Sequence, residues 1–216
     1  GAAYIFVEEE TGDNAIIICP GVAATISTAD IDVNADLIRS AAVFMTQLEQ
    51  PMDAAVRALG VAKEAGVKTI LNPAPASNLP DGMLALCDYV TPNETETEAL
   101  TGVAVKSVGD ARSAAEIFLS KGVGAAVITL GENGALFHSA EQSALVPAFN
   151  AGAVVETTGA GDAFNGGFAT ALARGDDPVG AVRTGCATAG LSVTRPGTAS
   201  SMPVSGEVKE LMERIP

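Results

Sequence analysis

Short apolar runs alternate with helix-length segments through the middle of the chain, and the links between them are short. The strand-like runs cover residues 42–48, 67–71, 88–91 and 125–129. The helix-like segments cover residues 52–65, 80–86, 92–100 and 107–121. Such alternation is typical of right-handed βαβ units, which place successive strands in a parallel sheet. The sequence therefore predicts an α/β fold, and ligands are expected at the carboxyl ends of its strands.

Further elements are expected on both sides of this block. Near the start, two apolar runs around the turn-forming letters TGDN predict a hairpin, residues 4–7 and 15–19. By pattern alone it is an ordinary edge hairpin. A helix is expected over residues 30–42, with three apolar side chains directed inward, Ile31, Leu37 and Ile38. Short strands are expected at residues 135–138, 143–147 and 153–155, and helices at residues 161–174, 178–193 and 207–215.

The composition excludes several classes of protein. Lys and Arg number 12 against 26 acidic residues, a net charge of −14, so nucleic acid and anionic membrane are not expected as partners. An anionic substrate must then be held by local devices such as helix N-termini or a divalent ion. The three cysteines are far apart and lack CxxC spacing, which argues against a disulfide framework and fits a cytoplasmic protein. No stretch approaches the length of a transmembrane span.

The letters TTGAGDAFNGGF, residues 157–168, predict a loop that runs into a helix. Gly159 and Gly161 allow close backbone approach to a ligand, and the first amides of a helix carry the positive end of its dipole. Apolar side chains follow at helical spacing on one face, Phe164, Phe168 and Leu172. An anion is therefore expected at the start of this helix.

Asp162, in the first turn of that helix, could remove a proton from a hydroxyl beside the anion. Phosphoryl transfer to an alcohol requires such a base. The four letters GAGD alone are equally consistent with a tight turn in which the aspartate has a capping role. The longer string is needed to separate the two interpretations.

Four other segments follow the strands in the same way: QLE at 47–49, NPAPA at 72–76, PNETE at 92–96 and ITLGENGA at 128–135. Taken alone, PNETE is ordinary for a helix N-terminus. Taken together and in this order, the five segments resemble the ribokinase-like (PfkB) sugar kinases. The resemblance implies a three-layer α/β/α sandwich with a mostly parallel sheet and a small β lid, only partly present. It also implies transfer of the ATP γ-phosphate to the primary hydroxyl of ribose.

The resemblance assigns roles to residues of the 157–168 segment and of the first strand end. Asp162 would be the general base and would contact the sugar. Gly159 and the amides of Ala160, Gly161 and Asp162 would form an anion hole for the transferred phosphoryl group. Glu49 resembles the acid that contacts the sugar hydroxyls.

The resemblance also implies a nucleotide site with magnesium. Asn93 would lie near the phosphates, and Glu96 would organise Mg²⁺ through water, which suits an ion that keeps several waters. Four residues would lie along ATP, namely Thr129, Gly131, Glu132 and Gly134, and Gly161 would contact its phosphates. Cys186 falls near the adenine, where the family pattern leads us to expect Asn or His, and we interpret it as a packing residue.

Many members of this family hold a monovalent cation beside the anion hole by means of an aspartate. Glu156 stands at that position here, and its extra methylene would disturb a coordination shell. Other groups could supply carbonyl or hydroxyl oxygens: Thr158, Ser192, Arg195 and Gly197. Dependence on K⁺ therefore stays open.

The beginning of the chain departs from the family pattern. Residues 1–20 would be the remnant of the lid, through which a homodimer is expected, and residues 21–216 the nucleotide-binding and catalytic core. The segment that carries most of the sugar site in the family lacks a counterpart, so we expect the chain to be part of a longer kinase. Two alternatives follow: another acceptor, such as fructose, a nucleoside or a sugar acid, or a truncated, non-catalytic nucleotide-binding protein.

Overall fold

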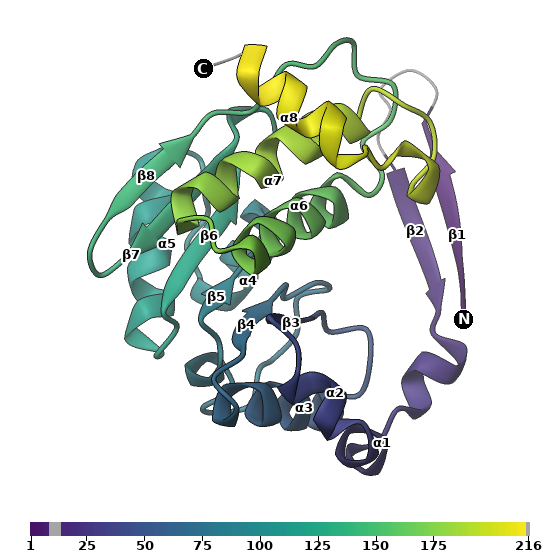
Figure 1. The fold of residues 1–216 in the computed structure, drawn as a ribbon, viewed down its shortest axis with the longest axis vertical. Coiled ribbons are helices and arrows are strands. Elements are labelled where there is room, and N and C mark those ends of the chain that lie inside the picture. The colour runs from purple at the N-terminus through teal and green to yellow at the C-terminus, as the bar shows by residue number, and fades with distance from the viewer. Residues whose placement is uncertain (9–13, 215–216) are drawn as a thin grey trace. The chain divides into compact units, whose positions relative to one another are not determined.

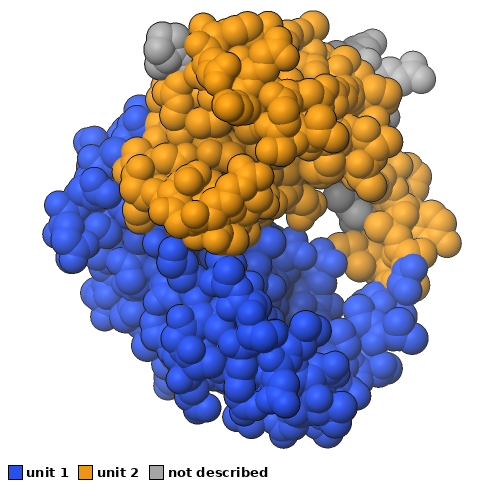
Figure 2. All heavy atoms as spheres, in the orientation of Figure 1, with its two compact units in different colours: residues 1, 20–130, 136–145 blue, residues 2–19, 131–135, 146–216 orange. Residues whose placement is uncertain are grey.

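The computed structural model describes residues 1–8 and 14–214 (Figure 1). The chain forms two compact units, which Figure 2 colours separately. Unit 1 contains Gly1, Pro20–Leu130 and Leu136–Leu145. Unit 2 contains Ala2–Cys19, Gly131–Ala135 and Val146–Pro216.

The sheet has six strands in sequence order. Its first four strands are β3 (Val43–Thr46), β4 (Lys68–Leu71), β5 (Tyr89–Val90) and β6 (Ala125–Thr129). These four pair in parallel, with Val43 opposite Lys68 and Tyr89 opposite Ala125. The last two strands are β7 (Ala135–Ser139) and β8 (Ser143–Val146). The predicted parallel α/β arrangement is therefore confirmed.

Five α-helices belong to unit 1: α1 (Thr28–Val33), α2 (Ala35–Arg39), α3 (Met52–Glu64), α4 (Glu94–Thr101) and α5 (Val108–Ser120). Helix α3 packs on β3 and β4, and α5 packs on β6. Local signals set the helix ends. The Ser107 hydroxyl accepts a hydrogen bond from the Asp110 amide at the start of α5. Gly66, at φ 72°, follows the end of α3.

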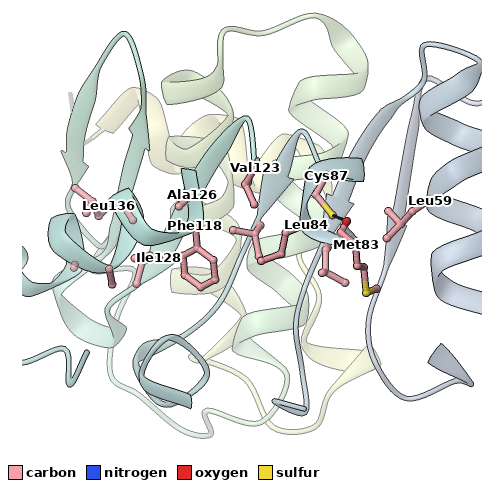
Figure 3. Close-up of a cluster of buried hydrophobic side chains, with 14 of the residues drawn as sticks. Leu59, Met83, Leu84, Cys87, Phe118, Val123, Ala126, Ile128 and Leu136 are labelled. Atoms are coloured by element: carbon pink, nitrogen blue, oxygen red, sulfur yellow. Dashed lines mark hydrogen bonds between the residues drawn. The ribbon is translucent and has the colours of Figure 1, made fainter. Parts of the chain in front are cut away.

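The core of unit 1 is built from aliphatic side chains around one phenylalanine, Phe118 of α5. Figure 3 shows Phe118 with Ile128 of β6, Leu136 of β7 and Leu59 of α3, all of which are fully buried. Each such side chain contributes roughly 1.5–3 kcal/mol by leaving water. The absence of tryptophan is thus compensated by many Ala, Val, Leu and Ile residues from both helices and strands.

Unit 2 contains the hairpin and the C-terminal helices. Strands β1 (Ala2–Val7) and β2 (Asn14–Cys19) pair antiparallel, which confirms the predicted hairpin, whereas most of its turn lies outside the described residues. The helices are α6 (Ala160–Arg174), α7 (Pro178–Ser192) and α8 (Ser205–Arg214). No helix among the described residues has the length and apolarity needed to cross a membrane.

Helices α6 and α7 approach closely because glycines lie at their contact. A β-carbon at Gly185 of α7 would lie 2.9 Å from the Phe164 ring and from the Phe164 carbonyl oxygen. A β-carbon at Gly167 of α6 would overlap the Thr188 hydroxyl. Phe164 itself is buried and stacks on Phe168, with ring centroids 6.1 Å apart. The apolar face predicted for this helix is therefore confirmed.

Several local predictions are wrong. The helix expected over residues 30–42 is two helices separated at Asn34, and Leu37 is 72% exposed whereas Ile38 is buried. The break rotates the second helix out of register with the first, so one apolar stripe does not extend through both. Residues 153–155 form no strand. The segment expected to be helical at residues 80–86 contains only a short 3₁₀ helix, Leu84–Leu86. The remaining 3₁₀ helices are Gly21–Thr25, Gly131–Asn133 and Ala199–Ser201.

Strand β3 is shorter and more exposed than the predicted buried strand over residues 42–48. It pairs with β4 alone within the described sheet. Its side chains are half-buried, and Met45 is 39% exposed. An edge strand has a neighbour on one side only, which explains why an apolar run does not imply complete burial here.

Candidate active site

Asn72 links the carboxyl ends of three neighbouring strands of unit 1. Its amide donates to the Thr46 carbonyl at 2.9 Å, and its side-chain amide donates to the Thr91 carbonyl at 2.9 Å. Its side-chain oxygen accepts a hydrogen bond from Gln47 Nε2 at 3.3 Å. Because Asn72 is 8% exposed, these bonds also satisfy its buried polar atoms. The QLE, NPAPA and PNETE segments therefore meet at one edge of the sheet.

The next strand joins the same edge. The Thr129 amide donates to the Pro92 carbonyl at 3.0 Å, which places the end of β6 beside the start of α4. Glu49 follows β3 and is exposed. Thr129, Pro92 and Glu49 thus occupy the strand ends predicted from the sequence, the edge at which sheets of this kind bind ligands.

Asn93 and Glu96 form a reciprocal cap at the start of α4. The Glu96 amide donates to Asn93 Oδ1 at 2.8 Å, and the Asn93 amide donates to Glu96 Oε2 at 2.9 Å. The side-chain amide of Asn93 also donates to Glu96 Oε1 at 3.1 Å. Partial burial raises the pKa of Glu96, although the Asn93 amide opposes this shift.

This cap fits an indirect role in magnesium binding. Both oxygens of Glu96 already accept a hydrogen bond from Asn93, and each retains capacity for a water molecule. Among the described residues no cluster of three or more His, Cys, Asp or Glu side chains could hold a metal ion. Mg²⁺ usually keeps several of its waters, so contact through water suits a carboxylate that is already hydrogen-bonded, as Glu96 is.

The start of α6 has the geometry expected of an anion site. Gly159 is left-handed at φ 79° and precedes the first helical residue. The Ala160 amide donates to the Thr157 carbonyl at 3.1 Å, whereas the Gly161 amide meets no acceptor among the described residues. The amide of Ala160 is thus engaged in the turn, and Gly161 is the better candidate donor. Asp162 is exposed, which agrees with the requirement that a base be accessible.

The backbone conformation explains why two positions of the 128–135 segment are glycine. Gly131 has φ 52° and Gly134 has φ 90°, a region in which other residues are strained. A β-carbon at Gly134 would overlap the Val146 carbonyl oxygen. Gly134 is therefore required by packing, while Gly131 and the neighbouring Glu132 are exposed.

Glu156 is bonded to the segment between α7 and α8. Its Oε2 accepts a hydrogen bond from the Gly197 amide at 2.8 Å, and this bond lowers the pKa of Glu156. The Ser192 carbonyl accepts a bond from the Arg195 amide at 3.2 Å. Arg195 in turn donates through its guanidinium to Glu207. The Glu156 carboxylate and the Ser192 carbonyl thus have partners within the protein, and potassium binding remains a prediction of the resemblance.

Two further candidates are buried. Cys186 of α7 is 5% exposed, and burial raises the pKa of its thiol to about 12. At neutral pH it is therefore a protonated, apolar packing residue. Thr158 is also buried, directly before Gly159.

Sequence reasoning missed two residues that organise these sites. Asn72 has no role of its own in the predictions and belongs only to the NPAPA segment, although an amide directly after a buried strand is a signal of a polar link between strand ends. Glu207 accepts from Arg195 and from the Val204 amide at 2.9 Å. Its distance from Arg195 along the chain leaves no local pattern that could have identified the pair.

A mostly parallel sheet flanked by helices defines an α/β protein, and polar side chains lie at the carboxyl ends of its strands. Comparison with protein families identifies it further. Residues 1–205 match the pfkB family of carbohydrate kinases, and the chain belongs to that family.

Individual relatives of the chain are also sugar kinases by name. The chain is 39% identical over 213 residues to "Ribokinase" of Haemophilus influenzae, covering 99% of this chain and 69% of the relative. It is 38% identical over 213 residues to "Deoxyribokinase" of Salmonella typhi, covering 98% of this chain and 69% of the relative.

A solved structure of Arabidopsis thaliana ribokinase, complexed with ribose and ATP, superposes with a TM-score of 0.90 at 28% identity. The match covers 98% of this chain and 68% of that one. The expected ribokinase-like fold, with a mostly parallel sheet flanked by helices, is thereby confirmed.

Proposed function

We propose that this protein is an ATP-dependent kinase that transfers the γ-phosphate to the primary hydroxyl of ribose. The observation that carries the proposal is the start of α6. There a left-handed Gly159, a Gly161 amide without an acceptor among the described residues and an exposed Asp162 occur within four consecutive residues. Backbone donors and a base at one helix start are what phosphoryl transfer to an alcohol requires.

Asp162 would accept the proton of the sugar hydroxyl as that oxygen attacks the γ-phosphorus. The bond between phosphorus and the bridging oxygen then breaks, and ADP leaves. The Gly161 amide and the positive end of the α6 dipole would stabilise the negative charge on the transferred group. The exposure of Asp162 supports this role, since a base must be accessible to its substrate.

The nucleotide would be bound with the help of Asn93, Thr129 and Gly131. Glu96 would orient waters of a bound Mg²⁺, which would supply charge neutralisation to the phosphates. The solved complex of the Arabidopsis relative with ribose and ATP supports both ligands. Glu49, exposed at the end of β3, would contact the sugar hydroxyls.

A second acceptor is favoured by a specific comparison. The Salmonella relative named deoxyribokinase is 38% identical, almost the same value as the Haemophilus ribokinase, over the same share of the chain. 2-Deoxyribose is therefore the first alternative to ribose. The ratio of kcat/KM values for the two sugars decides between them, and a panel with fructose, nucleosides and sugar acids tests the rest of the family.

Asp162→Asn is the direct test of the mechanism. Loss of a positioned base is expected to lower kcat by a factor of about 10² to 10⁴ while ATP binding persists. Asp176→Asn is the matched control, because Asp176 is equally exposed just beyond the other end of α6. Equal activity of the Asp162→Asn and parent proteins would refute the assignment. ATP binding without turnover on any sugar, by protein expressed from the complete reading frame, would favour a non-catalytic nucleotide-binding protein.

We also propose homodimer formation through the hairpin in the cytoplasm. The hairpin exposes several apolar side chains, with Tyr4 and Phe6 at 61% and Ile17 at 60%. Water-exposed apolar surface of this kind is typical of protein interfaces. Residues 1–20 would then be the lid remnant and residues 21–216 the nucleotide-binding and catalytic core. Sedimentation of Tyr4→Ser/Phe6→Ser against the parent protein tests the dimer.

A further inference from the structure

The segment between α7 and α8 returns to the start of α6. A β-carbon at Gly159 would lie 3.6 Å from the Thr198 side chain and 3.7 Å from Met202 Cε. Thr198 and Met202 are thus the side chains that flank the left-handed residue before α6. The conformation of Gly159 determines the direction of the amides that follow it, so whatever holds Thr198 and Met202 in place bears on those amides.

Three bonds hold this segment. The Gly197 amide donates to Glu156 Oε2 at 2.8 Å, Arg195 pairs with Glu207, and the Val204 amide donates to Glu207 Oε2 at 2.9 Å. The Glu207 bonds fix the two ends of the segment. The Glu156 bond is the one adjacent to Thr198, and Gly197, which donates it, is left-handed at φ 85°.

We infer that Glu156 is a positioning residue, which fastens the segment 196–202 beside Gly159 by accepting the Gly197 amide. The inference rests on the proposed function, because the fastened segment would keep the first turn of α6 in the conformation that binds the phosphoryl group. Glu156 precedes Gly159 by three residues, so one short stretch carries both the fastening carboxylate and the glycine that the segment flanks. When the bond is lost, Thr198 and Met202 can withdraw from Gly159.

This role requires an acceptor oxygen at position 156 and not a negative charge. Gln has the same length as Glu and retains a carbonyl oxygen, whereas Met has a similar length without a comparable acceptor. Asp retains the charge but its carboxylate is one methylene shorter. A residue that instead served as a ligand for a monovalent cation would need the charge, and it would give the opposite ranking of Gln and Asp.

The test combines amide hydrogen exchange with steady-state kinetics on Glu156→Gln, Glu156→Met and Glu156→Asp. We expect exchange at Gly197 to rise about tenfold in Glu156→Met and to stay within about threefold of the parent in Glu156→Gln, as for loss and retention of one hydrogen bond. We expect kcat to follow the same ranking, with KM for the sugar nearly unchanged. Unfolding midpoints of all three variants identify any global loss of folding.

The outcomes separate the inference from the function on which it rests. Unchanged exchange at Gly197 in Glu156→Met overturns the fastening role, whatever the activity. A Glu156→Gln protein with normal exchange but the low kcat of Glu156→Met overturns the positioning role and favours a charge requirement. An inactive parent in which the exchange ranking still holds contradicts the proposed function alone and leaves the fastening bond established.

Discussion

Substitution of Gly185 by Ala tests how α6 is held against α7. A β-carbon there would lie 2.9 Å from two atoms of the Phe164 ring and from the Phe164 carbonyl oxygen. This distance is well below the 3.4–4 Å of ordinary van der Waals contact. The ring cannot simply turn away, because Phe164 is 3% exposed and stacks on Phe168. The carbonyl oxygen belongs to the α6 backbone, so relief requires movement of a helix.

The magnitude follows from two opposing effects. Overpacking of a tight contact costs roughly 1–3 kcal/mol. Replacing a helical Gly by Ala raises the free energy of unfolding by about 1 kcal/mol, because Ala has the higher helix propensity. Gly185→Ala should therefore lower the free energy of unfolding by up to about 2 kcal/mol, which corresponds to a fall in Tm of up to about 8 °C for a chain of this length.

Gly166→Ala is the matched control within α6. No atom lies within 4 Å of a β-carbon built at Gly166, and the residue is exposed. The same substitution should therefore raise the free energy of unfolding by about 0.5–1 kcal/mol. Urea denaturation followed by circular dichroism compares the two variants with the parent. A midpoint for Gly185→Ala at or above that of Gly166→Ala would refute the close-contact explanation.

Two further predictions concern unit 1. The Thr69 hydroxyl is buried, donates to the Leu86 carbonyl at 2.7 Å and accepts from the Asp88 amide at 2.8 Å, so Thr69→Val should lower the free energy of unfolding by about 1–3 kcal/mol. Thr69→Ser retains the hydroxyl and should lower the free energy of unfolding less than Thr69→Val does. Equal decreases for the two variants in urea denaturation would contradict this account. At the start of α5, the Ser107 hydroxyl lowers the pKa of Asp110, so the stability contributed by Asp110 is present above its ordinary pKa of 3.8 and is lost as the pH falls through the lowered value. The difference in urea midpoint between the parent and Asp110→Asn should be present at neutral pH and disappear in acid, and a difference independent of pH would count against it.

The sequence was sufficient for the parallel sheet because the helices α3, α4 and α5 that lie between its strands carry end signals of their own. Ser107 before α5, Asn93 before α4 and Gly66 after α3 act locally, so their effect can be recognised from neighbouring letters. The 157–168 string likewise predicted both the loop that runs into α6 and the buried face of that helix. These features depend on interactions over one or two helical turns.

Features that depend on distant parts of the chain could not be predicted. Leu37 has the same apolar character as Ile38, yet only Ile38 is buried, because the break at Asn34 reorients the second helix. The bond from Gly197 to Glu156 and the pairing of Arg195 with Glu207 join residues 41 and 12 positions apart. Residue type indicates that such groups need partners, but it does not specify which partner each one finds.

The reciprocal cap at the start of α4 has a practical consequence for mutagenesis. Asn93 and Glu96 bond to each other through both backbone and side chain, so a substitution at either position weakens the end of a helix at the same time as it alters a proposed ligand contact. A lower affinity for nucleotide in such a variant would therefore combine two effects. A parallel measurement of helix order at the start of α4 is needed to separate the loss of a nucleotide contact from the weakening of the helix at these two residues.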